Sequence, residues 1–320
     1  MGTEIKSFRK AYKMGKISNT KTYVKLTIST VFGASAFIAA KFAVPYLPTA
    51  TLTFLRFGIA AAFLFFLSKG KYASSTPYTL QKKHIPFLAF TGIVGFAGYH
   101  MLFFIALKYT LAMNASILMG INPIFTTILA AIIIGGKIPP MQIFGIILSF
   151  VGAILTITGA DFSIIASFAF NKGEIIMLTG VILWAVYLVG NKALNPGIPP
   201  FFVTYYSFVF CSLFLLPFVI IEKPWTFILD VPFSAWAAIL FMAIFPSVIS
   251  YLIQQAAIGT IGPARTSIFL NLVPVFSIIL SCIFSLFIKV ISNFPHSFNA
   301  TAISPTVVYF FHFSTDKLLK

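Results

Sequence analysis

Long apolar stretches, separated by short segments of polar and turn-forming residues, make up most of the chain after about residue 24. A membrane crossing needs roughly 20 apolar residues. The stretches therefore predict nine membrane-spanning helices, at 24–44, 50–68, 86–107, 112–135, 141–160, 173–193, 200–221, 234–258 and 262–284. Proline and glycine are frequent in the connections, where the chain has to turn. The pattern predicts an all-α polytopic membrane protein.

One apolar, proline-centred segment occurs twice in the chain. Residues 116–129 read SILMGINPIFTTIL, and residues 267–280 read SIFLNLVPVFSIIL, at an offset of 151 positions. The same offset pairs Lys41 with Lys192 and Pro45 with Pro196, far upstream of the segment. Internal similarity at a fixed spacing is the signature of a duplicated unit. The sequence thus predicts two structural repeats.

The two repeats are expected to run in opposite directions through the membrane. Five predicted helices separate each element from its copy, and an odd number of crossings reverses the direction of the chain. We expect a first five-helix repeat over residues 24–160, a connecting loop over 161–172 and an inverted second repeat over 173–284. Inverted repeats are a recurring plan of secondary transporters, with the binding site where the repeats meet. The competing interpretation is a duplication that only enlarges a helical bundle.

The last helix of the second repeat is predicted to be missing or altered. The offset places the partner of helix 141–160 at residues 292–311, which read SNFPHSFNATAISPTVVYFF. Two prolines and several polar residues interrupt this segment, and its apolar part is too short to cross a bilayer. We interpret residues 285–320 as an aberrant tail, produced either by truncation or a frameshift or by genuine divergence.

The composition supports the membrane interpretation. Hydrophobic residues make up 59% of the 320 positions and charged residues 9%, whereas soluble domains contain about 25% charged residues. The formal net charge of +16 would suit a nucleic-acid-binding protein, but the basic residues fall in short segments between apolar stretches and not along one polar face. We therefore expect the lipid bilayer as a partner and no nucleic acid.

The distribution of Lys and Arg predicts the orientation, because cytoplasmic loops carry more of them. Seven basic residues lie before or at the start of the first helix. With the N-terminus inside, the cytoplasmic loops and helix ends would also hold Lys69, Lys71, Lys82, Lys83, Lys137, Lys192 and Arg265, and the loops of the opposite face only Lys108, Lys172 and Lys223. We expect a multi-pass protein of the cell (inner) membrane in which residues 1–23 form a basic cytoplasmic segment.

Four segments together resemble the EamA-like branch of the drug/metabolite transporter superfamily, over about residues 24–283. They read FGASAFIAAKFAV in the first helix, TFLRFGIAAAFLF in the second, ALKYTLAMNASILMGINPIFTTILAAIIIGGK across the third and fourth, and QAAIGTIGPARTSIFLNLVPVFSIIL in the second half. The resemblance implies ten helices, cytoplasmic termini and movement of small organic solutes, often export of amino acids or other metabolites. The tail departs from this pattern, and so does the sequence Gly135, Gly136, Lys137, where the family often has a glutamate.

Two prolines, Pro123 and Pro274, fall near the middle of their predicted helices. Proline removes a backbone donor and frees a carbonyl of the preceding turn, so we expect helix breaks that serve gating and free carbonyls that bind a solute. Asn122 and Asn271 lie beside these prolines and are candidate substrate-binding residues. The competing interpretation for this region is close helix packing.

Arg56 lies inside a predicted apolar helix, away from its ends. An unpaired charge in the membrane interior costs at least ~2.5–3.5 kcal/mol, so an intramembrane arginine is a candidate functional residue. A substrate carboxylate would supply the counter-charge; alternatively, Arg56 snorkels to the outer interface or bonds helix carbonyls. Lys41 and Lys192, at equivalent helix ends, are expected to anchor their helices.

Aromatic and polar residues of the third, sixth and eighth helices complete the predicted substrate-binding site. The offset of 151 maps Tyr99 onto position 250 and His100 onto Tyr251, and Gln254 follows three residues later. His100 could accept a proton near neutral pH and couple transport to a proton gradient, or stay neutral and hydrogen-bonded. Trp184 is compatible with an aromatic pocket or with an interfacial belt.

The sequence contains no pattern typical of an enzyme or a channel. The four histidines lack metal-ligand spacing, and no nucleophile, zinc-protease or phosphate-loop motif is present. We expect no catalytic residues, no metal and no cofactor. No Asp or Glu lies deep in a predicted helix, which argues against a carboxylate proton relay.

These observations predict a secondary transporter that exports amino acids or similar small organic metabolites by alternating access. The alternative is a truncated or frameshifted, non-transporting membrane remnant of such a transporter. The pattern is also compatible with a homodimer.

Overall fold

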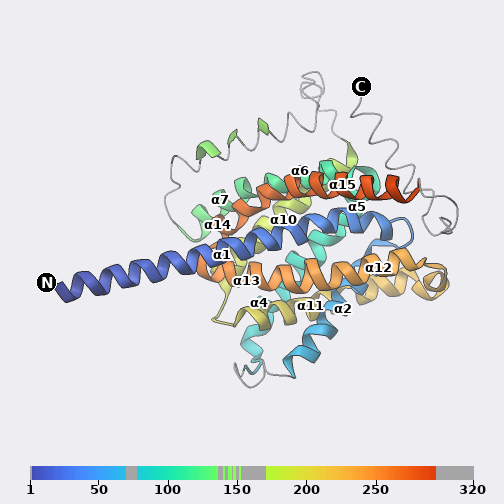
Figure 1. The fold of residues 1–320 in the computed structure, drawn as a ribbon. Coiled ribbons are helices and arrows are strands. Elements are labelled where there is room, and N and C mark those ends of the chain that lie inside the picture. The colour runs from blue at the N-terminus through green and yellow to red at the C-terminus, as the bar shows by residue number, and fades with distance from the viewer. Residues whose placement is uncertain are drawn as a thin grey trace.

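The computed structural model describes residues 2–69, 78–135, 140, 143–145, 147–148, 151–152 and 171–292, with the backbone alone for 2–19 and 285–292. All regular structure in these residues is helical (Figure 1). Within them, eight helical stretches are long and apolar enough to cross a membrane. Large apolar side chains such as Phe66, Ile132 and Ile221 are exposed on the surface of these stretches. The all-α polytopic fold predicted from the sequence is confirmed.

The eight stretches match eight of the nine predicted spans to within a few residues. They are Thr20–Ala43, Thr49–Ser68, Lys82–Tyr109, Ala112–Ile133, Lys172–Leu194, Pro200–Glu222, Phe233–Ile261 and Pro263–Phe284. The predicted fifth span, 141–160, lies largely outside the described residues. Prolines mark several starts: Pro48, Pro199 and Pro232 immediately precede the first helical residue of their elements.

Four spans are formed by uninterrupted helices. These are α1 (Gly2–Ala43), α2 (Thr49–Ser68), α10 (Lys172–Leu194) and α11 (Pro200–Glu222). α10 begins with a capping box, in which the Asn171 side chain accepts from Gly173 N at 2.7 Å and Glu174 accepts from Asn171 N at 3.0 Å. The box satisfies backbone donors that a helix start leaves without partners.

Two spans contain a π-helical segment at equivalent positions. The third span runs through η1 (Lys82–His84), α4 (Ile85–Phe90), η2 (Thr91–Gly98) and α5 (Tyr99–Tyr109), and η2 is π-helical. The span Phe233–Ile261 runs through α12 (Phe233–Met242), η5 (Ala243–Ile249) and α13 (Ser250–Ile261), and η5 is π-helical. Adding the offset of 151 to the last residue of η2 gives the last residue of η5. The two halves therefore share an irregular feature that the sequence did not predict.

The two spans that contain Pro123 and Pro274 are both interrupted, where the sequence predicted helix breaks. The fourth span divides at Ile121 into α6 (Ala112–Gly120) and α7 (Asn122–Ile133). The last span divides into α14 (Pro263–Ile268), the 3₁₀ turn η6 (Phe269–Asn271) and α15 (Leu272–Ser292). The breaks meet, because a Cβ atom added to Gly120 would lie 3.0 Å from Pro274 Cγ.

Contacts at Thr110, the residue after α5, bring the end of α1 and the start of α10 together. Lys41, in the last turn of α1, donates to Thr110 O at 2.7 Å. Gly173, in the first turn of α10, lies against the Thr110 backbone, since an added Cβ would be 2.9 Å from Thr110 N. The end of α1 and the start of α10 thus lie at the same place. The inverted relation of the two repeats, which would require such a meeting of an end with a start, stays a prediction.

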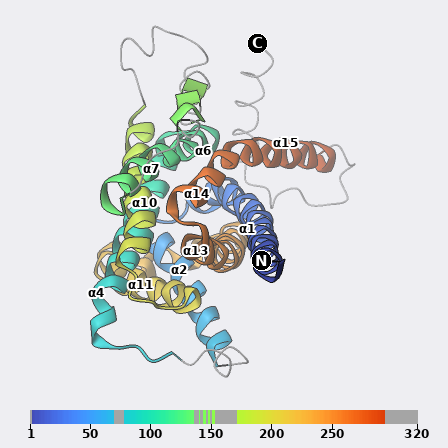
Figure 2. The same ribbon diagram turned by 90° about the vertical axis from the view of Figure 1, so that its left-hand side faces the viewer.

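Helices of the two halves pack on each other throughout the bundle. α2 lies against α11, α10 against α5, and α1 against both α13 and α15. Figure 2 shows α1 and α13 near the centre of the bundle, with α14 above them and α15 extending to one side. The interior between these helices holds the residues that the sequence singled out.

The helices at the two ends of the described chain extend beyond the predicted first and last spans. α1 begins at Gly2, so the basic segment 1–23 is largely helical, and it extends beyond the bundle (Figure 1). α15 continues to Ser292, eight residues past the predicted end at 284, because residues 285–292 (SLFIKVIS) are still largely apolar. Residues 293–320, which hold most of the predicted aberrant tail, lie outside the described residues.

Candidate functional site

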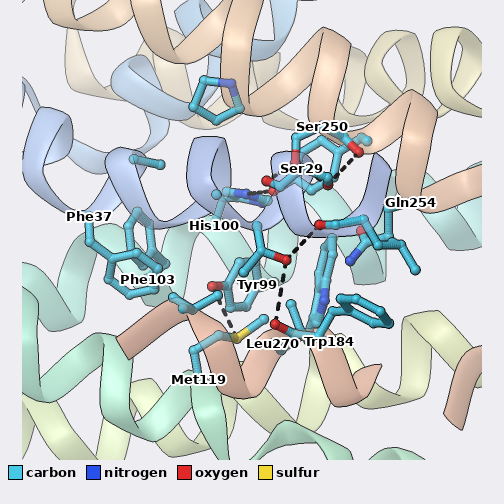
Figure 3. Close-up of a pocket in the computed structure, with 18 of the residues that line it drawn as sticks. Ser29, Phe37, Tyr99, His100, Phe103, Met119, Trp184, Ser250, Gln254 and Leu270 are labelled. Atoms are coloured by element: carbon cyan, nitrogen blue, oxygen red, sulfur yellow. Dashed lines mark hydrogen bonds between the residues drawn. The ribbon is translucent and has the colours of Figure 1, made fainter. Parts of the chain in front are cut away.

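A cavity of about 60 Å³ lies in the interior, between helices of the two halves. α1, α2, α5 and α6 of the first half contribute to its wall, and α10, η5, α13, α14, η6 and α15 of the second. Six residues predicted from the sequence line it together: Arg56, Tyr99, His100, Trp184, Tyr251 and Gln254. Figure 3 shows the cavity with Tyr99 and His100 between its two sides.

Arg56, on α2, has 1% of its surface exposed. Its Nε donates to Ser247 Oγ at 2.9 Å, and its guanidinium also hydrogen-bonds with the Tyr251 side chain. Ser247 in turn donates to Met242 O at 2.9 Å, so its hydroxyl is free to accept from Arg56. These contacts place Arg56 in the interior and not at the outer interface, and they do not involve helix carbonyls. No residue that lines the cavity is Asp or Glu.

His100 and Tyr251, which are 151 positions apart, form a hydrogen bond with each other. His100 Nε2 lies 2.8 Å from the Tyr251 hydroxyl. His100 Nδ1 lies 2.9 Å from Phe96 O, and because a carbonyl can only accept, Nδ1 carries the proton. Nε2 then accepts from Tyr251, whose oxygen is left to accept from Arg56. With a neutral imidazole, each hydrogen bond in the series Phe96 O, His100, Tyr251 and Arg56 thus has one donor and one acceptor.

Aromatic rings enclose the cavity on several sides. The ring centroid of Trp184 lies 4.9 Å from that of Tyr99 and 5.5 Å from that of Tyr251. Phe37 of α1 packs edge-on against Phe103 of α5, with centroids 4.9 Å apart. Trp184 is 1% exposed, so its position is that of an aromatic pocket and not of an interfacial belt.

Two buried polar atoms of the cavity wall have no hydrogen-bond partner among the described residues. They are Trp184 Nε1, a donor, and Gln254 Oε1, an acceptor. Unpaired buried polar atoms are uncommon in proteins, and each calls for an explanation such as a bound water or ligand.

The structure adds polar residues that the sequence did not single out. Ser29 of α1 and Ser250 of α13 join at 2.7 Å between their hydroxyls, and both line the cavity. Ser247, which accepts a hydrogen bond from Arg56, is another polar residue that the sequence did not single out. Ser250 is the offset equivalent of Tyr99, so the repeat was a signal that could have identified it. Ser247 corresponds to Phe96 and carried no such signal.

Four predicted residues do not line the cavity: Asn122, Asn271, Pro123 and Pro274. Asn122 is buried, where its Nδ2 donates to Val181 O at 2.8 Å and its Oδ1 accepts from Thr126 at 2.8 Å. It therefore connects α7 to α10. Pro274 packs on Gly120 at the meeting point of the two broken helices.

The two lysines at equivalent helix ends make equivalent contacts. Lys41 donates to the carbonyls of Leu107 and Thr110 at the end of α5. Lys192 donates to Gly259 O near the end of α13, at 2.9 Å. A cation at a helix C-terminus is favoured by the helix dipole. Both lysines have contacts that fit the predicted anchoring role.

The described residues contain no group of three or more His, Cys, Asp or Glu side chains placed to hold a metal ion. Of the cysteines, Cys211 is buried and Cys282 is exposed, and both are free thiols.

Comparison with known proteins gives similarity along most of the chain. The profile of the EamA-like transporter family matches residues 20–158 and, a second time, residues 171–292. The protein named uncharacterized transporter YyaM of Bacillus subtilis is 34% identical over 263 residues, which are 81% of this chain and 84% of that protein. An uncharacterized transporter of Archaeoglobus fulgidus is 28% identical over 264 residues, 82% of this chain and 88% of that protein.

A more distant relative carries a more specific name. The probable terminal-alkyne amino-acid exporter of Streptantibioticus cattleyicolor is 24% identical over 256 residues, 80% of this chain and 82% of that protein. A solved crystal structure of a protein with 18% sequence identity superposes with a TM-score of 0.54, covering 90% of this chain and 93% of that chain. At that identity, the structural likeness shows the fold alone.

Proposed function

The chain belongs to the EamA-like transporter family, and from that premise we propose that it exports amino acids or similar small organic metabolites by alternating access. A transporter role and a multi-pass membrane location follow from the family and from the eight apolar spans. The solute class, the direction of transport and the mechanism are the proposal.

The buried guanidinium of Arg56 is the main observation that supports the proposed solute class. Its partners, Ser247 and Tyr251, are neutral, and the cavity wall contains no carboxylate. A charge without a counter-charge in a low-dielectric interior is costly. A carboxylate on the solute supplies the missing negative charge and can accept from two guanidinium N–H groups at once. The name of the Streptantibioticus cattleyicolor relative, an amino-acid exporter, supports the same class.

The two halves of the bundle support an alternating-access mechanism. The cavity lies between them, and the end of α1 meets the start of α10. With inverted repeats, one half closes the side that the other half opens. The helix breaks before Pro123 and at η6 before Pro274 meet beside the cavity, where a small change of angle would move the wall. We assign these prolines a gating role on this basis.

The site also constrains the source of energy. The cavity wall has no carboxylate to carry a proton, and the hydrogen bonds of His100 are those of a neutral imidazole. Transport driven by the gradient of the solute itself, or by exchange of one solute for another, fits this chemistry. We place the protein in the cell (inner) membrane with its N-terminus in the cytoplasm, as the positions of the basic residues favour.

Solute exchange in proteoliposomes tests this function. Vesicles containing the purified protein are loaded with one unlabelled amino acid at a time, and uptake of the same labelled amino acid is measured. We expect uptake for at least one amino acid, and its loss in Arg56→Gln. The matched control is Arg265→Gln, because Arg265 is exposed. Uptake that survives Arg56→Gln would contradict the role given to the guanidinium.

One observation keeps the non-transporting remnant as a second candidate. The first family match ends at residue 158, and the offset of 151 would carry the second to residue 309, but it ends at residue 292. If the protein melts cooperatively in detergent yet exchanges no amino acid, a variant with a complete tenth helix should be assayed. Activity restored by that helix would favour the remnant.

A further inference from the structure

The cavity has a second polar region besides Arg56. It consists of Trp184 and Gln254, whose Nε1 and Oε1 atoms lack partners among the described residues. Both side chains are more than nine-tenths buried, with 1% and 7% of their surfaces exposed, and both line the cavity. In the view of Figure 3 they lie on one side of the cavity, and the apolar rings of Phe37 and Phe103 lie on the other.

The two unpartnered atoms have opposite needs. Trp184 Nε1 can only donate a hydrogen bond, so it requires an acceptor on the ligand. Gln254 Oε1 can only accept, so it requires a donor. A ligand that supplies just one of these groups leaves the other atom buried and unpaired, which is unfavourable. The pair therefore favours a solute with an acceptor and a donor close together.

Arg56 lies near this region through Tyr251. The Arg56 guanidinium hydrogen-bonds with Tyr251, and Gln254 follows Tyr251 by three residues on α13. Side chains three residues apart on a helix are neighbours, about 5–6 Å between Cβ atoms. A positive charge and a carbonyl oxygen are thus presented to the cavity from adjacent positions. An α-amino acid carries a carboxylate and an ammonium group on one carbon atom, so it presents a negative and a positive charge side by side.

The rings around the cavity would add to the binding of a cation. Trp184 and Tyr251 have ring centroids 5.5 Å apart, and Trp184 and Tyr99 have ring centroids 4.9 Å apart. Aromatic faces attract an ammonium group, most strongly when it is removed from water. This contribution lets the site bind an ammonium group although its wall contains no carboxylate.

We propose, on the basis of the proposed function, that Gln254 is the specificity-determining residue of the cavity. It binds the ammonium group of the solute, so that amino acids bind more tightly than carboxylates without an amino group. Arg56 and Trp184 Nε1 hold the carboxylate, Gln254 Oε1 accepts from the ammonium group, and Phe37 and Phe103 face the apolar side chain.

Matched pairs of ligands test this assignment on the full-length protein in detergent, by calorimetric titration. The pairs differ only in the amino group: L-alanine with propionate, L-valine with 3-methylbutyrate, and L-phenylalanine with 3-phenylpropionate. We expect the amino acid of at least one pair to bind tenfold or more tightly than its partner. Gln254→Met keeps the length of the side chain. In this variant the affinity for the amino acid should fall to that for its partner carboxylate, and the affinity for the carboxylate should not change.

Further variants separate the possible outcomes. Trp184→Phe should weaken both members of a pair by a similar factor, because it removes a donor to the shared carboxylate. Gln81→Met, at an exposed position, should change neither. Equal wild-type affinities within every pair, with binding lost in Arg56→Gln, would overturn the role of Gln254 and leave the carboxylate site intact. This comparison needs no Gln254 variant to fold.

Two other results would also count against the assignment. A preference for amino acids that persists in Gln254→Met would show that another group reads the ammonium. If no ligand of the three pairs binds, the assignment fails, and the proposed function fails with it only if the exchange assay also shows no uptake of any amino acid. Binding that is indifferent to Arg56→Gln would contradict both.

Discussion

His100 and Tyr251 show how single residues gain meaning from their partners. In the sequence, a histidine inside an apolar helix was compatible with a proton carrier or with a neutral, hydrogen-bonded side chain. In the structure, His100 Nδ1 faces Phe96 O and Nε2 faces the Tyr251 hydroxyl, which also meets the Arg56 guanidinium. A second proton on His100 would place an imidazolium beside Arg56 and turn the Tyr251 hydroxyl away from its acceptor. The geometry favours a positioning role, in which His100 orients Tyr251 toward Arg56.

This positioning role predicts the behaviour of His100→Gln. We expect a lower rate of solute exchange in proteoliposomes, because the flexible glutamine amide does not hold Tyr251 as the imidazole does between Phe96 O and the Tyr251 hydroxyl. The pH profile should keep the same shape across neutral pH as in the wild type. His84→Gln is the matched control, since His84 bonds Tyr78 at 2.6 Å outside the cavity. A pH dependence that is present in the wild type and absent in His100→Gln would restore His100 as a proton carrier.

Among the elements, the two π-helical segments both pack against a helix of the other half. η2 packs on α11, and η5 packs on α2. Thr91 and Ser207 join across the first contact at 2.6 Å, and Arg56 and Ser247 join across the second at 2.9 Å. Position 207 is the offset equivalent of position 56. The two contacts thus use equivalent positions of α2 and α11 but different positions of the π-helical segments, because Ser247 corresponds to Phe96 and not to Thr91. Only the second contact presents a charge to the cavity.

Gly92 makes the first of these contacts possible and gives a prediction for this element. A Cβ atom at Gly92 would lie 2.7 Å from Phe210 Cβ and 2.7 Å from Ser207 O. Gly92→Ala must therefore push α11 away, at a cost of roughly 1–3 kcal/mol. We expect a melting temperature several degrees lower in detergent. In Gly58→Ala, the new atom would meet only Ser212 Oγ, at 3.9 Å, so its melting temperature should stay near that of the wild type. If Gly92→Ala and the wild type melted at the same temperature, η2 and α11 would be less tightly packed than described.

The elements also show what the sequence could predict. Apolar stretches located eight spans, because burial in lipid requires length and hydrophobicity whatever the neighbours are. Pro123 and Pro274 located the helix breaks, because proline acts on its own backbone. The π-helical segments were not predicted: η5 contains Pro246, but η2 contains no proline.

The site shows the limit of sequence reasoning more sharply. Six of the residues chosen by repeat offset and residue chemistry line one cavity, and their role in binding stays a prediction. Asn122 was chosen by the same reasoning, yet it bonds Val181 O of the neighbouring α10. The sequence gives the face of a helix on which a residue lies, but not which backbone that face meets. The unpaired atoms of Trp184 and Gln254 are likewise visible only once all neighbours are in place.

At the scale of the whole molecule, the question is how many times the chain crosses the membrane. Eight described spans and the predicted span at 141–160 make nine. The family resemblance implies ten, which would require a crossing within the tail. α14, η6 and α15 form one helical stretch from Pro263 to Ser292, and the prolines at 295 and 305 interrupt the sequence that follows it.

We therefore predict that the two ends of the chain lie on opposite sides of the membrane. Reporters of membrane side would be fused after Gly135, after Asn171 and after Lys320, each in cells that express the N-terminal part up to that residue. With a cytoplasmic N-terminus, four spans should leave the first reporter in the cytoplasm, and five should place the second outside. After nine spans the reporter at Lys320 should also be outside, because residues 293–320 are too polar and too rich in proline to cross. A cytoplasmic signal at Lys320 alone would show that the tail does cross. The second repeat would then have its fifth helix, and the remnant interpretation would lose the observation that supports it.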